Sequence, residues 1–190
     1  MKFETVSSHA VRLPRTNIDT DQIIPARFLK VTGKMGIGSH LFADWRALPD
    51  FALNLPESAD SRILIAGDNF GCGSSREHAV WALMDYGFRV VISTRFGDIF
   101  RQNAYKNGLL PIVLDSVMHQ RLMALPSRAI LTIDLSQQML FGDGFPTTRF
   151  SIDSFSKKCL IEDIDELGYI LEYEEAITRY EGSSGETRLD

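Results

Sequence analysis

A glycine-rich turn between a strand pattern and a helix pattern constrains the fold of this chain more than any other feature. Residues 62–66 form a short, branched apolar run of strand length, whereas the apolar residues of 77–86 recur at the spacing of one helical face. Between them, residues 68–76 hold two glycines, two serines and an arginine. The first amides of a helix have no partner inside the helix and lie at its positive end. The turn therefore predicts a site for a carboxylate or a phosphate.

The two serines of this turn allow two interpretations. Ser74 and Glu77 have the spacing of a capping box, in which the serine hydroxyl accepts a hydrogen bond from the third helical amide and the glutamate binds back. Because Ser75 is adjacent, one serine can cap the helix while the other faces a ligand, and the spacing leaves open which does which. Gly73 leaves the backbone accessible to a ligand, and Arg76 adds a planar, bidentate donor for a carboxylate.

Length and composition favour one globular domain. The chain has 190 residues, of which 44% are hydrophobic, so we expect a single domain over residues 1–190 with a disordered polar tail at 181–190. The formal net charge of −5 argues against a nucleic-acid-binding surface. No apolar run approaches the roughly 18 residues that cross a bilayer, and the start lacks a secretory core, so we expect a cytoplasmic protein without a membrane contact.

The cysteines do not form a recognisable framework. Cys72 and Cys159 lie far apart and outside any CxxC pattern, which predicts neither a disulfide nor a complete metal site. Any metal would therefore have to come from elsewhere. Cys72 lies beside the turn, but no fixed base accompanies it, so a nucleophilic role is disfavoured. Trp45 and Trp81 are interpreted as core or interface aromatics.

Strand and helix patterns alternate over residues 62–114, which predicts βαβ units and a parallel core sheet in an α/β fold. Residues 33–56 are expected to form a loop with a short helix, and Gly87 and Gly108 are expected to end helices. The expected helices are 76–86, 97–107, 116–124, 154–162 and 173–180. The expected strands are 62–66, 89–93, 111–114, 129–134, 138–141 and 149–152, with a hairpin turn at 142–144.

Several ordered segments carry a resemblance to a known family. Residues 17–25, 71–79 and 96–100, followed by Asn103 and residues 108–111, closely resemble the swivel domain of the aconitase superfamily. Within it, the chain resembles the family of bacterial isopropylmalate dehydratase small subunits, which share a segment like residues 38–46. The similarity extends from about residue 11 to residue 180. It implies a swivelling β/β/α three-layer domain with a mixed sheet around a parallel βαβ core.

The resemblance also implies a reaction and a partner. The family moves a hydroxyl between neighbouring carbons of a dicarboxylic acid by dehydration and rehydration. A [4Fe-4S] cluster on a large subunit acts as the Lewis acid, in a heterodimer or heterotetramer, and no metal is bound by the small chain itself. By position, the base is Ser74 and the carboxylate-binding residue is Arg76, with Ser75 and Gly73 also at the substrate and His78 as supporting residue. A serine base needs donors that stabilise its alkoxide.

Substrate choice is expected to depend on a loop after the 17–25 segment. In the family this loop contacts the variable group of the substrate, and here it corresponds to Phe28, Leu29, Lys30 and Val31. An isopropyl group offers only apolar surface, which suits the three apolar residues. Lys30 could favour an extra carboxylate, or it could lay its stem along the pocket wall with its charge in water.

Several alternatives remain open on the sequence. Asp19 and Asp21 resemble a paired-carboxylate site, but aspartates around a threonine more often fix a turn through bonds to the backbone. The substrate could be homoaconitate, citraconate or dimethylmalate, and the chain could also be a stand-alone anion-binding module. A serine hydrolase is disfavoured, since residues 73–77 lack the second glycine of a nucleophile elbow.

Overall fold

The computed structural model describes residues 2–3, 5–30, 33–171 and 173–184. A parallel sheet lies at its centre, with the strand order β2-β3-β4-β5. Helix α3 (Glu77–Tyr86) connects β3 to β4, and α4 (Asp98–Asn107) connects β4 to β5. The expected βαβ core is therefore confirmed. The four strands are β2 (Ala10–Leu13), β3 (Ile63–Ala66), β4 (Val90–Ser93) and β5 (Leu110–Val113).

A second, antiparallel sheet forms from the remaining strands in the order β1-β6-β7-β8. The predicted β/β/α layering is confirmed, with two separate sheets in place of one mixed sheet. The chain passes from one sheet to the other at His9, between β1 and β2. The strands of this sheet are β1 (Val6–Ser8), β6 (Leu131–Asp134), β7 (Met139–Gly142) and β8 (Phe145–Arg149).

The hairpin between β7 and β8 turns at residues 143–144, as predicted. The predicted strand at 149–152 was wrong, because the strand occupies residues 145–149 and includes Pro146. Proline has no backbone N–H and cannot donate a hydrogen bond to a neighbouring strand. β8 is the edge strand of its sheet, however, and an edge tolerates a residue that cannot donate to a neighbour.

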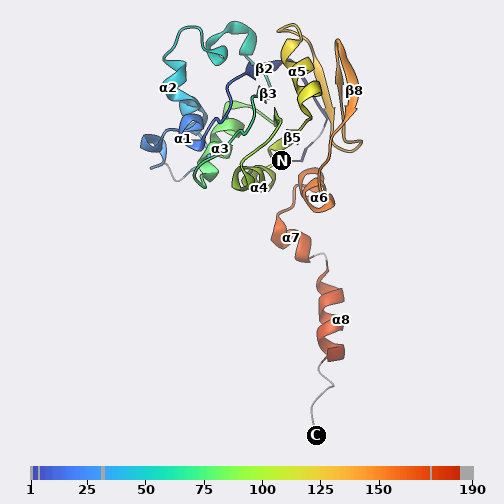
Figure 1. The fold of residues 1–190 in the computed structure, drawn as a ribbon. Helices are drawn as coiled ribbons and strands as arrows, with labels where there is room; N and C mark the ends of the chain where they lie inside the picture. Colours follow the sequence, from blue (N-terminus) through green and yellow to red (C-terminus); the bar gives the residue numbers. More distant parts are fainter. Residues whose placement is uncertain (1, 4, 31–32, 172, 185–190) are drawn as a thin grey trace.

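The parallel sheet separates two apolar cores. Leu64 and Val91 point to the face covered by α3 and α4, whereas Ile63, Ile65 and Val90 point to the antiparallel sheet. This alternation is the expected two-residue period of a strand, and both faces are apolar because both are buried. Figure 1 shows α3 and α4 on one side of the parallel strands and β8 on the other.

Short elements occupy the N-terminal third, and the expected loop with a short helix over 33–56 is confirmed. The glycines at 87 and 108 end α3 and α4 as predicted. The short elements are the helices α1 (Thr20–Ile23) and α2 (Ala43–Arg46) and the 3-10 helices Ala26–Phe28, Ile37–His40, Ala52–Asn54 and Pro56–Ser58.

The C-terminal helices agree with the sequence up to Glu162 and then differ. Helices α5 (Ser116–Ala124) and α6 (Ser154–Glu162) have the predicted bounds. Helix α7 (Glu166–Leu171) was not predicted, and α8 (Glu174–Ser184) extends beyond the expected 173–180. Residues 181–184 of the expected disordered tail are therefore helical, and 185–190 lie outside the described residues. In Figure 1, α7 and α8 extend away from the sheets beyond α6.

Candidate functional site

The backbone of the glycine-rich turn is fixed by the segment that precedes α1. The Gly71 amide donates to the Ile18 carbonyl at 2.7 Å, and the Thr20 amide donates to the Cys72 carbonyl at 3.0 Å. The Thr20 hydroxyl donates to the Ser74 carbonyl, also at 3.0 Å. Two of the sequence segments singled out above, more than fifty residues apart in the chain, thus form one site at the carboxyl end of β3.

Glycine is required at two positions of the turn for different reasons. Gly71 has φ +71°, and a Cβ atom there would lie 2.3 Å from Cγ of Phe100. Gly97, which precedes α4 and lies outside the turn, packs equally closely, because a Cβ atom there would lie 2.4 Å from the Gly71 carbonyl oxygen. Gly73 has φ +90° with looser surroundings, so its backbone angle rather than its space demands glycine.

The prediction that Ser74 or Ser75 caps α3 was wrong. The helix begins at Glu77 with Arg76 at its N-cap position, and no side chain caps this end among the described residues. The reason is that residues 72–74 run beside the 19–20 segment, with a bridge between Cys72 and Asp19, before the chain turns into the helix. Gly73, Ser74 and Ser75 are exposed instead, in the three positions before Arg76.

Arg76 forms an ion pair with Asp21, through Nη1 and Oδ1. The Arg76 side chain is only 18% exposed, whereas that of Asp21 is 53% exposed. A mostly buried guanidinium that meets a carboxylate at the surface has a defined orientation. Arg76 is thus paired with a carboxylate of this chain, and its binding of a substrate carboxylate stays a prediction.

Asp19 and Asp21 have different roles. Asp19 is the N-cap of α1, where its carboxylate accepts from the Gln22 amide at 2.8 Å and its own amide donates to Gln22 Oε1 at 3.0 Å. The turn-fixing prediction is therefore confirmed for Asp19. It was wrong for Asp21, which points to Arg76, and sequence reasoning missed this pairing. An acidic residue in the first turn of so short a helix was the available signal.

The start of α3 is supported by a polar and aromatic cluster. His78 lies with its ring 4.5 Å from that of Trp81. Trp81 Nε1 donates to Asn107 Oδ1 at 3.0 Å, and the Asn107 amide group donates to Glu77 Oε1 at 2.7 Å. These contacts place His78 beside the helix start, two positions after Arg76, and a supporting role for it stays a prediction. Trp81 and Trp45 pack against the core, as predicted.

The predicted substrate loop, residues 28–31, begins at the last residue of the 3-10 helix Ala26–Phe28. Phe28 stacks on His40 with 4.0 Å between ring centroids, and the Arg27 guanidinium lies 4.6 Å from the Phe28 ring centroid. Phe28 and Leu29 are partly buried against the core, whereas Lys30 is exposed. Val31 lies outside the described residues.

The thiol of Cys72 is not activated by its surroundings. Burial raises its pKa, and the nearby carboxylate of Asp19 raises it further. A raised pKa lowers the thiolate fraction, which is the nucleophilic form. Among the described residues, no group of three or more His, Cys, Asp or Glu side chains could hold a metal ion. No described helix has the length and apolarity to span a membrane.

Comparison with known proteins identifies the group to which this chain belongs. Residues 1–117 match the family model described as the aconitase C-terminal domain. The chain belongs to the aconitase C-terminal domain family. Within that family it is similar over almost its whole length to proteins named 3-isopropylmalate dehydratase small subunit. One, from Anaeromyxobacter sp. (strain K), is 54% identical over 186 residues, which is 95% of this chain and 97% of the relative.

Two further members of the aconitase C-terminal domain group extend this similarity. A small subunit of the same name from Herpetosiphon aurantiacus is 56% identical over 184 residues, covering 95% of this chain and 93% of the relative. The crystal structure of a 3-isopropylmalate dehydratase from Methanocaldococcus jannaschii superposes with a TM-score of 0.71. It has 26% sequence identity and covers 93% of this chain and 99% of that one. The family expected from the sequence motifs is confirmed.

Proposed function

We propose that this chain is the small subunit of a 3-isopropylmalate dehydratase, a cytoplasmic hydro-lyase of leucine biosynthesis. The complex would interconvert 2-isopropylmalate and 3-isopropylmalate through 2-isopropylmaleate. Two relatives of that name, 54% and 56% identical along nearly the whole chain, support the activity. The observation that carries the site is the exposed Ser74–Ser75 pair directly before Arg76, whose side chain is already oriented by a carboxylate.

In this proposal Arg76 binds a carboxylate of the substrate in place of Asp21. Its planar guanidinium can make two parallel hydrogen bonds to one carboxylate, which fixes the orientation of the substrate. Ser74, two positions earlier and exposed, would take the proton from the carbon next to that carboxylate. A serine alkoxide is stabilised by hydrogen-bond donors and by exclusion of water. A partner that covers this exposed turn would exclude the water.

The residues of this chain do not fit a [4Fe-4S] cluster. Cys72 lies in the turn and Cys159 lies in α6, and the described residues contain no group of three metal-binding side chains. Clusters are held by several cysteine thiolates. We therefore place the cluster on the large subunit, where it would supply the Lewis acid for the substrate hydroxyl. This chain would supply the base and the carboxylate-binding arginine.

The first test is reconstitution. The chain is purified alone and together with the large subunit of the same organism under anaerobic conditions, and hydration of 2-isopropylmaleate is followed by its absorbance. We expect turnover only from the complex. Turnover by the isolated chain without iron, or an inactive complex whose cluster is intact, would contradict the proposed function.

The second test separates the two serines in the reconstituted complex. Ser74→Ala removes the proposed base, so we expect kcat to fall by a factor of roughly 100 to 10,000, the usual contribution of a general base. Ser75→Ala is the matched control, since the same hydroxyl is lost one residue away, and we expect mainly a higher KM. A loss of only a few-fold for Ser74→Ala, with normal assembly, would assign the base to another residue.

The third test concerns substrate choice. Phe28 and Leu29 present apolar surface, which suits an isopropyl group. We compare isopropylmalate with homoaconitate, citraconate and dimethylmalate, in the wild-type complex and in Lys30→Val. Preference for isopropylmalate in both proteins supports the proposal. A wild-type preference for homoaconitate that Lys30→Val abolishes would assign Lys30 to an extra carboxylate.

A further inference from the structure

The last two helices form an exposed apolar surface. We call residues 166–184 the C-terminal arm; it comprises α7 and α8, which extend away from the two sheets in Figure 1. Every described side chain from residue 173 to residue 181 is exposed. Ile177 is 40% exposed and Tyr180 is 73% exposed. The large exposed apolar residues of the arm are Leu167, Ile170, Leu171, Tyr173, Ile177 and Tyr180.

The described part of the chain leaves the large apolar residues of the arm exposed. Helix α8 has 11 residues, and an isolated helix of that length is marginal in water. Most helices are stabilised by packing one apolar face. In α8, Ile177 and Tyr180 are three residues apart, and the Ile177 amide donates to the Tyr173 carbonyl at 2.9 Å, so these three residues lie along one side of the helix. Ile170 and Leu171 are exposed in the preceding helix, α7.

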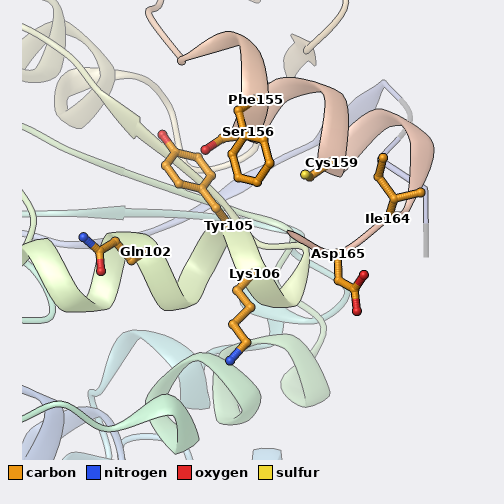
Figure 2. A pocket seen from close by; sticks show the side chains of 8 residues that line it. All are labelled: Gln102, Tyr105, Lys106, Phe155, Ser156, Cys159, Ile164 and Asp165. Atoms are coloured by element: carbon orange, nitrogen blue, oxygen red, sulfur yellow. The ribbon is translucent and has the colours of Figure 1, made fainter. Parts of the chain in front are cut away.

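The root of the arm, at Tyr169 of α7, is held against α6 by contacts of the Tyr169 ring. Tyr169 meets the ring of Phe155 edge-on at 4.8 Å, and Lys158 of α6 lies 5.1 Å from the Tyr169 ring centroid. Next to this root is a cavity of about 420 Å³ between α4 and α6 (Figure 2). It is lined by Gln102, Tyr105 and Lys106 of α4, by Phe155, Ser156 and Cys159 of α6, and by Ile164 and Asp165.

Gly71 of the turn packs against Phe100 in the first turn of α4, whereas the cavity is lined by the second half of the same helix. Lys106 lines the cavity, and the next residue, Asn107, donates to Glu77, the first residue of α3. The turn with Ser74 immediately precedes that residue. A chain that covers the turn would have to extend along α4 to reach the cavity and the arm.

The charge of the arm indicates whether its partner is a second copy of this chain or a different chain. From residue 165 to 181, Arg179 is the only basic residue, and the acidic residues are Asp165, Glu166, Glu172, Glu174, Glu175 and Glu181. Pairing with the arm of a second copy would bring like charges together, which opposes association. The surface instead fits a different chain that offers an apolar groove bordered by lysine or arginine.

We propose that the C-terminal arm, with the cavity at its root, is the docking surface for the large subunit, which would receive it in an apolar groove with basic edges. This inference rests on the proposed function, because that function requires a second chain over the turn. The apolar face would supply the affinity. The acidic residues would supply orientation and a faster association at low salt.

The test measures the dissociation constant of the full-length chain with the purified large subunit. The variant is the double substitution Ile170→Ser and Ile177→Ser, and Thr178→Ser on the same helix is the matched control. We expect the double variant to bind about tenfold more weakly or worse, because buried apolar anchors dominate interface affinity. At saturating concentration its kcat should equal that of the wild type. Because both positions are exposed, its urea midpoint should not change.

Each outcome decides a different point. If wild-type subunits form an active complex and the double variant binds equally well, the docking role of the arm is overturned while the proposed function stands. If the wild-type subunits neither associate nor turn over, the proposed function itself fails. Sedimentation of the chain alone tests the second-copy alternative, since a dimer that the double variant disrupts would overturn the large subunit as occupant.

Discussion

The glycine-rich turn at 68–76 and the C-terminal arm are both exposed, but their exposure has opposite origins. The turn has a fixed backbone, bonded to the 18–20 segment, that presents small polar side chains. The arm presents large apolar side chains that are exposed in the described structure, and ring contacts hold Tyr169 at its start. A rigid frame with exposed hydroxyls suits a small ligand, whereas an exposed apolar helix suits a protein partner. The exposure of a side chain therefore indicates a function only when the contacts that fix its backbone are considered as well.

The largest expected effect tests how rigid the turn is. Gly71→Ala places a methyl group against Phe100 and forces a positive φ, so we expect a loss of about 3 kcal/mol or more in unfolding free energy. Gly36→Ala is the control, since Gly36 has φ +83° but no neighbour within 4 Å. It should cost only the backbone strain, about 1–2 kcal/mol. Equal losses in urea unfolding would mean that close packing of the turn contributes nothing.

A smaller effect is expected from the arginine geometry. Arg76→Lys keeps the charge but loses the planar fork, and we expect kcat/KM of the reconstituted complex to fall about 100-fold, or roughly 2.7 kcal/mol. Arg95→Lys is the control, because Arg95 pairs with Asp68 at 2.9 Å and is well exposed. It should change kcat/KM no more than a few-fold. Similar losses in both variants would show a general charge effect instead of a carboxylate-binding role for Arg76.

Removing the cap of α1 should lower the unfolding free energy less than Gly71→Ala does. Asp19→Ala removes the side-chain bond to the Gln22 amide, so we expect a loss of about 1 kcal/mol in unfolding free energy. Asp21→Ala removes an ion pair in which the carboxylate is half exposed, so we expect the unfolding free energy to fall by no more than about 1 kcal/mol. In the reconstituted complex this substitution should change mainly KM. The prediction fails if Asp21→Ala destabilises the fold more than Asp19→Ala.

The smallest effect compares thiols in the two regions. Burial raises the pKa of Cys72, so its thiolate fraction at a given pH is reduced and its alkylation curve shifts to higher pH. In a Cys159→Ser chain, iodoacetamide should therefore react more slowly with Cys72 than with a cysteine introduced by Thr178→Cys in a chain lacking both native cysteines. Equal rates across pH 7 to 9 would show that the turn does not shield its thiol.

The fold was predictable where its causes are local in the sequence. Branched apolar runs gave β3 and β4, and the glycines at 87 and 108 gave the ends of α3 and α4. The strand predicted at 149–152 lies at 145–149 instead and includes Pro146. Whether a proline lies at a sheet edge depends on the order of strands, which no local pattern contains.

The site was predictable in its members but not in their contacts. Arg76 was expected to bind a carboxylate, but the position of Asp21 in the first turn of a short helix did not identify it as the partner. The capping box at Ser74 failed because Thr20, 54 residues earlier, binds the Ser74 carbonyl and holds the chain away from the helix. Such contacts between distant segments exist only once the sheet has formed, and they determined which side chains of the turn were left exposed.

The pairing of Arg76 with Asp21 makes anion binding at this site a competition within the molecule. In the proposed function an incoming carboxylate would replace one that is already present, so the gain in binding free energy would be a difference between two similar interactions. A lone small anion then gains little by binding. A substrate gains more when its other groups contact the partner chain at the same time. The carboxylate of Asp21 would therefore favour the complete substrate over any fragment that shares its charge.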